Sequence, residues 1–537
     1  MRILFVLTFT FLSFAIRAQL TINGLVTVPP DNQPGIGVTV MVRGTDTGTI
    51  TDLDGQYSIT VQDTDAVLVF TYTGYAEQSW KVGSRSTINV QLEESISLLN
   101  EVVVTGYGSQ KRSSISGSVS TVDASEITER PILRVEQALQ GRAAGVQVAP
   151  VSGSPGSALT VRIRGVGTIN NSDPLYIVDG VPVDGLDFLN PNDIESINVL
   201  KDAASASIYG SRGANGVVLV TTKGGKRGQA GTISYETYYG IQRAARYVDL
   251  LTAEEYATIQ NEAYIAAGKT PLPEFAVPSV LGEGTDWQEA IFETAPIFNH
   301  QLTIAGGGEK SAYTLSANYF SQDGIVGGDK ANFTRGTVRL SGSHDLKKWL
   351  TIGQNLGFTW LQRDALIENS QYDSPLIRAL NMDPVTPIKK ADGTYAYSNY
   401  SDTDIGNPVN GIEQTYNTWT TNRFVGSLYG DFKIVKGLTL RSAFSLDATY
   451  AVQDIFYPRF DLSNIPSISE APPAEKRLVN SVVVGNNTWR NWQWENVLTY
   501  QTTFDEKHDL TLIAGTTALQ NRYDASGGAN TNLPSND

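Results

Sequence analysis

The sequence has no cysteine and only three histidines, His300, His344 and His508, which are widely spaced along its 537 residues. Without cysteine there can be no disulfide framework, no thiolate metal site and no thiol nucleophile. The spacing of the histidines does not indicate a zinc site. The lack of cysteine also excludes attachment of a lipid to an N-terminal cysteine. We therefore expect no metal site and no cofactor.

Charged side chains are scarce, and basic ones especially so. Charged residues make up 18% of the chain, below the ~25% of an average soluble protein. The 55 acidic residues outnumber the 40 basic ones, so the net charge is −15. Nucleic-acid binding requires a basic surface, and we expect no nucleic-acid partner. We also find no nucleophile elbow and no paired carboxylates, and so do not expect an enzyme.

Long apolar runs are missing from most of the chain. No internal stretch approaches the ~20 continuous apolar residues of a transmembrane helix. The main apolar run, residues 3–16, follows Arg2 and is followed by Ala18, a small residue suited to cleavage, although Ile16 is larger than usual at its position. We predict that residues 1–18 are a signal peptide and that the mature chain is exported.

Glycine and tyrosine are abundant instead, with 50 glycines and 24 tyrosines. Between residues 20 and 95, short β-rich runs alternate with turn sequences at residues 29–32 and 52–55. This spacing predicts a small antiparallel sandwich. The Thr-Asp-x-x-Gly-x-Tyr-Ser turn that begins at Thr51 makes the segment similar to the carboxypeptidase-regulatory-like domain.

A short valine-rich stretch follows in the joint between two domain-like regions. Its residues are Glu101, Val102, Val103, Val104, Thr105, Gly106, Tyr107 and Gly108. Valine and threonine favour extended backbone, and the glycines end the run. Such a segment can add as an extra strand to the sheet edge of another protein. Its alternative interpretation is the last strand of the domain before it.

Residues 112–228 predict a mixed α/β domain. A helix is expected at residues 135–144, and the expected strands are residues 159–163, 175–178, 194–200 and 217–222. Gly165 and Gly167 do not make a dinucleotide fingerprint, because the third glycine and the following helix are absent. Asn170, Asn171 and Asp173 lie in a loop and are polar enough to contact a substrate, although such residues also cap turns.

The remaining residues, 229–537, alternate between apolar and polar side chains. Tyr313, Leu315 and Tyr319 alternate with Thr314, Ser316 and Asn318, as in the strands of a membrane β-barrel. Short connections are expected at residues 307–310, 344–348, 435–436 and 502–508, and long ones at 242–298, 321–333, 361–421 and 448–491. This alternation favours a barrel with two unlike rims. A large soluble β protein with one solvated face is the alternative.

Three runs of the α/β segment carry a family resemblance. They are Pro-Leu-Tyr-Ile-Val-Asp-Gly-Val-Pro from Pro174, Ile-Glu-Ser-Ile-Asn-Val-Leu-Lys-Asp from Ile194, and Ala-Ser-Ile-Tyr-Gly-Ser-Arg-Gly-Ala-Asn-Gly-Val-Val from Ala206. They resemble the plug domain of TonB-dependent outer-membrane transporters. The order of sandwich, Glu-Val-Val-Val-Thr-Gly-Tyr-Gly and plug is similar to that of the SusC-like group.

The resemblance implies a mainly β fold: an N-terminal β-sandwich, an α/β plug domain and the first part of a large antiparallel transmembrane β-barrel. The implied domains are a signal peptide (1–18), the sandwich (19–95), a linker with the TonB box (96–111), the plug (112–228) and a partial barrel (229–537). Residues 101–108 would be the TonB box, which pairs with TonB by strand addition.

The function that this resemblance implies is TonB-dependent, energy-coupled import of a nutrient, an oligosaccharide or a peptide. The implied location is the outer membrane of a Gram-negative bacterium, with contact to outer-membrane lipid. The implied partners are TonB with its inner-membrane energising complex and a SusD-like surface lipoprotein. The alternative is a secreted or surface β-rich adhesion or signalling protein that binds partners without transport.

The number of strands is small for a transporter of this kind. Plugged barrels of the family have about 22 strands, whereas residues 229–537 hold about nine candidates. So few strands cannot close around the plug, and the unpaired edges of an open sheet are unstable in lipid. We expect the sequence to be the N-terminal portion of a longer protein.

Overall fold

The computed structural model describes residues 20–29, 33–45, 47–72, 75–93, 102–105, 108–111, 118–128, 132–368, 370, 374–400, 405–461, 476–505 and 508–536. One compact unit contains residues 20–93 and the other contains residues 118–536, with the boundary between them in residues 102–111. The expected signal peptide, residues 1–18, lies outside the described residues. Within the described part of the chain, every helix is too short or too polar to cross a membrane.

Residues 20–93 form a small sandwich, as the sequence predicts. Its strands are β1 (Leu20–Val28), β2 (Gln33–Pro34), β3 (Thr39–Val42), β4 (Gly48–Ile50), β5 (Gln56–Val61), β6 (Val67–Thr71), β7 (Gln78–Lys81) and β8 (Val90–Gln91). One sheet has the order β2-β1-β5, with β8 on β1, and the other has the order β4-β3-β6-β7. Alternate residues of β5 are buried, which is the pattern of a strand with one face on a core. The unit has its own hydrophobic core, which includes Ile22, Val40, Tyr57 and Phe70.

The second unit contains the α/β domain, called the plug below. Its elements are β11 (Val119–Asp123), α2 (Ala124–Thr128), η2 (Val135–Leu139), β12 (Val146–Pro150), β13 (Leu159–Ile163), β14 (Leu175–Val178), β15 (Val181–Val183), η3 (Pro191–Asp193), β16 (Ile194–Leu200), α3 (Ala203–Ala206), η4 (Ser207–Gly213) and β17 (Val217–Thr222). The main sheet has the order β11-β16-β17-β14-β15, and β12 pairs with β13. The expected helix at residues 135–144 is a shorter 3₁₀ helix, η2, because the chain turns at Gly141 (φ 75°) and Gly145 (φ 75°).

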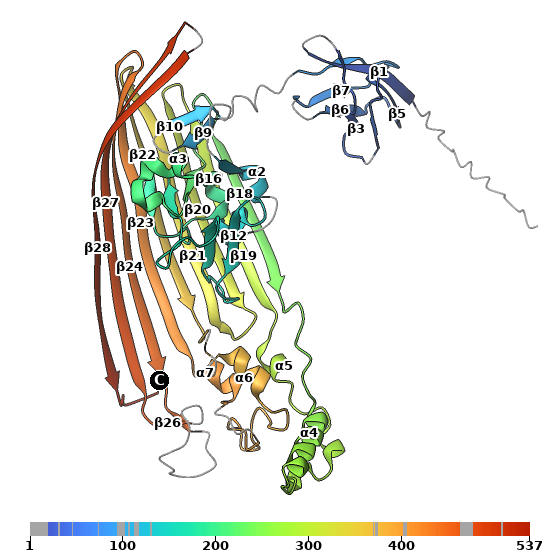
Figure 1. The fold of residues 1–537 in the computed structure, drawn as a ribbon, viewed down its shortest axis with the longest axis vertical. Coiled ribbons are helices and arrows are strands. Elements are labelled where there is room, and N and C mark those ends of the chain that lie inside the picture. The colour runs from blue at the N-terminus through green and yellow to red at the C-terminus, as the bar shows by residue number, and fades with distance from the viewer. Residues whose placement is uncertain are drawn as a thin grey trace, which may run out of the picture. The chain divides into compact units, whose positions relative to one another are not determined.

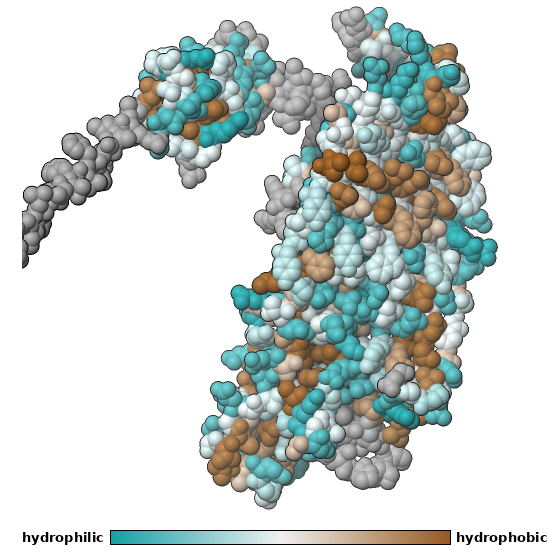
Figure 2. Space-filling model, turned by 180° about the vertical axis from the view of Figure 1, so that it is seen from behind, coloured by the Kyte–Doolittle hydropathy of each residue, from teal (hydrophilic) through white to brown (hydrophobic). Residues whose placement is uncertain are grey.

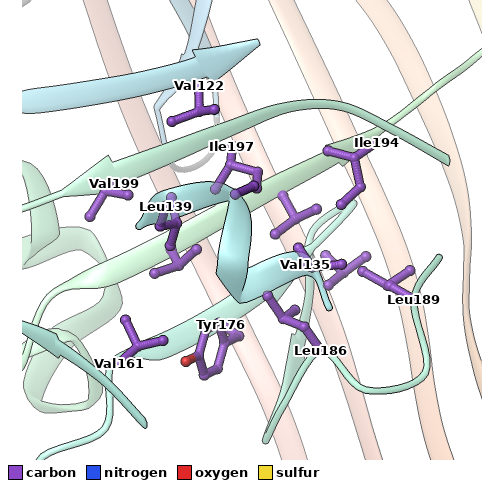
Figure 3. Close-up of a cluster of buried hydrophobic side chains, with 14 of the residues drawn as sticks. Val122, Val135, Leu139, Val161, Tyr176, Leu186, Leu189, Ile194, Ile197 and Val199 are labelled. Atoms are coloured by element: carbon purple, nitrogen blue, oxygen red, sulfur yellow. The ribbon is translucent and has the colours of Figure 1, made fainter. Parts of the chain in front are cut away.

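The core of the plug lies between its main sheet and the η2 segment (Figure 3). Figure 3 shows Val122 of β11 and Ile197 of β16 on the same side of the sheet as Val135 and Leu139. These four side chains are at most 2% exposed. β17 lies inside the sheet, and its residues 217–220 are all apolar and buried, as expected for a strand covered on both faces.

The rest of the second unit is a curved antiparallel sheet, called the barrel sheet below (Figure 1). Its strands are β18 (Thr232–Gln242), β19 (Ala295–Gly307), β20 (Ser311–Gly324), β21 (Gly328–Lys347), β22 (Leu350–Asp364), β23 (Tyr416–Val435), β24 (Leu438–Tyr457), β27 (Ser481–Phe504) and β28 (His508–Thr531). They pair in chain order in a 9-stranded sheet. The plug lies against the concave face of this sheet.

Burial in the barrel sheet is the inverse of that in a soluble protein. On β20, Leu315 and Tyr319 are 40% and 45% exposed, whereas Ser316 and Asn318 are 4% and 6% exposed. Polar side chains therefore face the plug, and apolar side chains face outward. Figure 2 shows the outer face, where hydrophobic side chains gather in patches over the strands. The alternation predicted from the sequence is confirmed, with the register as expected.

The connections between barrel strands agree with the prediction at all but one place. The short links after β19, β21, β23 and β27 are confirmed, and long links follow β18, β22 and β24. The expected long link at residues 321–333 is wrong, because β20 runs on to Gly324 and β21 begins at Gly328. Gly327 and Gly328 adopt positive φ there (78° and 46°), which permits a tight turn.

The long links fold into short helices with a core of their own. The helices are α4 (Ala253–Ala266), η5 (Pro273–Phe275), η6 (Pro278–Val280), α5 (Trp287–Ile291), α6 (Pro375–Asn381) and α7 (Pro408–Glu413), and a small ladder joins β25 (Phe460–Asp461) to β26 (Lys476–Arg477). Thr252 and Glu255 form a capping box at the start of α4. Trp287 is buried and donates its indole N–H to the carbonyl of Asp383, which joins two links about 100 residues apart.

Candidate coupling segment and plug-binding surface

The valine-rich stretch of the joint, residues 101–108, is called the coupling segment below. Its residues Val102–Thr105 form β9, which pairs with β10 (Gly108–Lys111) in a sheet of two strands. Glu101, Gly106 and Tyr107 lie outside the described residues. β9 is therefore extended, as expected, and its partner in the described structure is the neighbouring β10 rather than an interior strand of a larger sheet. An isolated two-stranded sheet is marginally stable, so β9 can exchange partners at low cost.

The plug is fixed to the barrel sheet first by a hairpin tip. Asp179 and Gly180 join β14 to β15 with φ of 48° and 86°, as in the two-residue Asp-Gly turn of hairpins. This turn presents the Asp179 carboxylate to Arg339 of β21 at 2.9 Å, with both side chains nearly buried. The same carboxylate accepts hydrogen bonds from the backbone N–H and the hydroxyl of Thr222. The tip thus ties β14, β17 and the barrel sheet together.

A second attachment is the segment of residues 184–193, called the anchor loop below. Arg335 is fully buried, and its Nη1 donates to the carbonyls of Asp187 (3.0 Å) and Leu189 (2.8 Å). The Thr359 hydroxyl donates to the Phe188 carbonyl at 3.0 Å. Three consecutive carbonyls of the anchor loop are thereby hydrogen-bonded to barrel side chains. A loop held through its backbone in this way cannot move without leaving buried donors unpaired.

Arg423 of β23 adds a charged contact to the anchor loop. Its guanidinium binds both carboxylate oxygens of Asp447 at 3.0 and 2.8 Å, contacts Asp187 at 3.3 Å, and lies 4.4 Å from the centre of the Phe188 ring. A fork-to-fork pair with a carboxylate is a strong, directional arrangement. The carboxylate of Asp447 holds the guanidinium in place, and the guanidinium in turn contacts Asp187 and Phe188 of the plug.

The end of the anchor loop is polar and deeply buried. Gln301 of β19 accepts from Asn190 Nδ2 at 2.5 Å and donates to Asp193 Oδ1 at 2.9 Å. Burial raises the pKa of the Asp193 carboxyl, because the charged form loses its water. The hydrogen bond from Gln301 and the nearby charge of Arg339 oppose that shift.

The third attachment is the glycine-rich connection from plug to barrel. A Cβ at Gly225 would lie 2.3 Å from the Tyr313 carbonyl oxygen, so only glycine fits this close approach. Gly228 and Gln229 pair through their backbones with the turn between β19 and β20, at 3.0 Å in both directions. Arg227 also forms an ion pair with Asp345 at 2.8 Å. The C-terminal end of the plug is therefore packed directly on the barrel sheet.

The inner face of the barrel sheet also lines a polar cavity of about 430 Å³. Arg227, Asp431, Arg441 and Thr499 are among its lining residues. Arg441 binds Asp431 through two hydrogen bonds of 2.6 and 2.8 Å. The charges that would be costly in lipid thus lie on the wet face of the strands.

The predicted substrate-contact residues lie on an exposed plug loop. Asn170, Asn171 and Asp173 are all exposed. Asn171 Oδ1 accepts from the backbone N–H of Asp173 at 2.9 Å, and Asp173 pairs with Arg162. These contacts are the turn-capping role that such residues often have. Contact with a substrate stays a prediction.

Sequence reasoning missed most of the plug-binding residues. The alternation pattern indicates that Arg339 faces inward, but it does not name Asp179 as its partner. Nothing in the sequence marks Asp187, Asn190 or Gln301, because each is an ordinary polar residue until the fold brings it to the plug surface. The one local signal is the Asp-Gly pair at the hairpin tip.

Two domain models match the chain. The TonB-dependent Receptor Plug Domain matches residues 111–217, and the CarboxypepD_reg-like domain matches residues 22–104. Together with a plug held on the polar face of an antiparallel sheet, these matches indicate the class that the chain resembles: the sandwich, plug and barrel strands of TonB-dependent receptors.

Within that class the similarity is to SusC-like proteins. The chain is 36% identical to TonB-dependent receptor P3 of Formosa agariphila over 92% of its length, and 32% identical to TonB-dependent receptor SusC of Bacteroides thetaiotaomicron over 81%. These alignments cover 47% and 45% of the two relatives, so the chain spans about half the length of the curated relatives it matches.

A solved structure agrees with these sequence matches. The RagAB peptide importer in its open-open state matches 81% of this chain and 51% of its own, with a TM-score of 0.70 and 28% identity. The resemblance to SusC-like TonB-dependent receptors is therefore confirmed over the length compared.

Proposed function

We propose that the chain acts in TonB-dependent, energy-coupled import of a nutrient across the outer membrane of a Gram-negative bacterium. The observation that carries this proposal is the plug seated on the polar inner face of a sheet whose outer face is apolar. A plug that lies inside a lipid-facing barrel must be rearranged before a solute can pass through the barrel. The signal peptide at residues 1–18 and the domain limits 19–95, 96–111, 112–228 and 229–537 belong to this proposal.

The coupling segment is the TonB box of this proposal. β9 carries three valines and a threonine, and it is paired only locally with β10 in the described structure. TonB would add its own strand to β9, either at the free edge or in place of β10. Force applied there would reach the plug through the residues that follow.

The partners and the cargo are inferred from relatives. The similar solved structure is that of a peptide importer, and one similar sequence is a SusC. We infer a SusD-like surface lipoprotein as partner and an oligosaccharide or a peptide as cargo. Asn170, Asn171 and Asp173 would meet the cargo from the plug side. The apolar outer face of the barrel sheet would contact outer-membrane lipid.

A proline in β9 tests the coupling segment. Val103→Pro removes a backbone N–H that an added strand needs, so binding of the purified C-terminal domain of TonB should fall at least tenfold. Isothermal calorimetry on the purified protein measures this loss. Val103→Ile keeps the N–H and is the matched control, with affinity expected within about twofold of wild type. Equal binding by the proline variant would remove the coupling segment from the proposal.

A further inference from the structure

Two arginines lie side by side on the outer face of the barrel sheet. Arg490 of β27 and Arg522 of β28 are directly opposite each other in the antiparallel ladder. They share the face of Leu498, because every second residue of a strand points the same way and the ladder runs without a bulge. Their side chains are 53% and 59% exposed. Like charges directly opposite in a sheet repel each other, so this pair favours a nearby anion.

One carboxylate offsets part of this repulsion. Asp524 Oδ2 accepts from Arg490 Nη2 at 2.6 Å and from Arg522 Nε at 2.9 Å, and Asp524 Oδ1 accepts from Arg522 Nη2 at 3.1 Å. In the described part of the chain, Asp524 is the one carboxylate with which these arginines form ion pairs. The group therefore keeps a net positive charge. Because a guanidinium has more N–H donors than these bonds use, both side chains can still bind a further anion.

The arginine pair lies beyond the apolar part of the outer face. Between it and the short turn after β27, this face presents Trp494 and Leu498 and ends at Phe504. Arg490 is 14 residues from Phe504, which is roughly 36 Å along the barrel axis at ~3.4 Å per residue and a tilt of about 40°. The apolar band of an outer-membrane barrel is ~25 Å tall, and its short turns face the periplasm. We therefore expect the arginine pair at the level of the headgroups of the outer leaflet.

Aromatic side chains mark the same boundary. Trp492 stacks on Phe444 with ring centres 6.2 Å apart, and Trp494 is 51% exposed. The indole N–H groups of both tryptophans are hydrogen-bonded to side chains of neighbouring strands. Tryptophan in this arrangement is typical of the interface between membrane and water. Arg490 is the next residue on this face after Trp492, and its neighbour on β24, Ala448, is too small to cover it.

We propose that Arg490 and Arg522 form a binding site for the phosphate group of an outer-leaflet lipid, with Asp524 holding the two guanidiniums side by side. A phosphate offers several oxygens, which can accept from both guanidiniums in the forked geometry that arginine favours. The apolar side chains of Trp494 and Leu498 lie where the acyl chains would run, which favours a lipid over free phosphate. The bound lipid fixes the height of β27 and β28 in the membrane.

The inference rests on the proposed function, which places the barrel sheet in the outer membrane. Binding of lipid A by the full-length protein in detergent micelles tests the site, with native mass spectrometry as the measurement. Phosphorylated lipid A should bind at least tenfold more tightly than the same lipid without its phosphates. Inorganic phosphate should not displace it. Equal binding of the two lipids would overturn the inference, and displacement by inorganic phosphate would overturn the assignment to a lipid.

Variants of the two arginines locate the site. Arg490→Gln with Arg522→Gln should weaken the binding of phosphorylated lipid A at least tenfold. Arg490→Lys with Arg522→Lys keeps both charges but loses the forked geometry, so the loss should be smaller, about threefold. Arg43→Gln is the matched control, because Arg43 is an exposed arginine that pairs with one carboxylate in the sandwich. Its binding of lipid A should equal that of wild type.

Unchanged binding by the double glutamine variant would overturn the inference. Heat-dependent migration in detergent gels shows whether each variant has a folded barrel, so a loss of binding cannot be confused with misfolding. Failure of the proposed function looks different. A chain that does not belong in a membrane would not insert into lipid vesicles, whatever their headgroups. Insertion of the wild type without preference for phosphorylated lipid A would mean that this inference alone fails.

Discussion

The packing of Tyr57 makes the stability of the N-terminal sandwich depend on pH. Its ring meets Phe70 edge-on at 5.4 Å, and its hydroxyl donates to the Ile88 carbonyl at 2.8 Å. Burial raises the pKa of Tyr57 to about 12, because the phenolate would lose its water. The neutral ring is therefore favoured in the folded sandwich.

Alkaline unfolding of the sandwich should report this side chain. The pKa of Tyr57 is raised from 10.0 to about 12 on folding, so its contribution to stability is complete below pH 10 and is lost as pH rises toward 12. Urea titrations of residues 19–95 between pH 8 and about 12 would measure the decline. Tyr57→Phe should lower stability by about 1 kcal/mol at pH 8 and flatten the decline. The same decline in the variant would show that another group is responsible.

At the scale of elements, the strands of the barrel sheet show which features the local sequence pattern predicts and which it does not. On β20 the alternation of apolar and polar residues predicts both the strand and the face of each side chain, since successive side chains point to opposite faces. The end of that strand is not predicted, because the pairing with β21 extends it past the expected loop to Gly324. The local sequence pattern does not contain the information on which strands pair and how far the pairing extends.

Cysteine labelling of β27 tests the register. Thr499 lines the polar cavity of the inner face, whereas Leu498 is 37% exposed on the outer face. In lipid vesicles, Thr499→Cys should react with a water-soluble maleimide at least tenfold faster than Leu498→Cys. Addition of detergent should narrow the difference by uncovering Leu498→Cys. Faster labelling of Leu498→Cys in vesicles would mean a shift of one residue, which exchanges the two faces.

For the molecule as a whole, the contact of plug and barrel sheet matters more than either part alone. Arg423 joins Asp447 on the sheet to Asp187 on the plug, and its side chain is 10% exposed. Loss of one partner from such a buried pair leaves an uncompensated charge. Exposed pairs on the same sheet, such as Arg522 with Asp524, are well solvated and contribute little.

This difference predicts two unequal variants. Arg423→Gln should reduce plug stability by about 3–5 kcal/mol, because it leaves Asp447 buried without its partner. Arg522→Gln, the matched control, should cost less than about 1 kcal/mol. Protease sensitivity of the plug across a urea titration in detergent would measure both. Equal small effects would show that Arg423 does not hold the plug.

The features of the candidate site that could be predicted are those that depend on residues close together in the sequence. The coupling segment is visible because three valines and a threonine between turn residues favour extended backbone whatever surrounds them. The Asp-Gly pair at the hairpin tip is visible for a similar reason. By contrast, Gln301 lies 111 residues from Asn190, and Arg423 lies 236 residues from Asp187, so no local rule relates them.

The sequence by itself determined the order of sandwich, coupling segment, plug and barrel strands, and which side chains face inward. Those properties follow from propensities and from a period of two residues, which are local. Only the tertiary structure decided which barrel residues bind the plug. It also decided that β11 is an edge strand, with a hydrogen bond to the Asp202 side chain at its start, and that β9 pairs with β10. These properties depend on chain segments that meet in space after folding, and the energy of each contact exists only once both partners are in place.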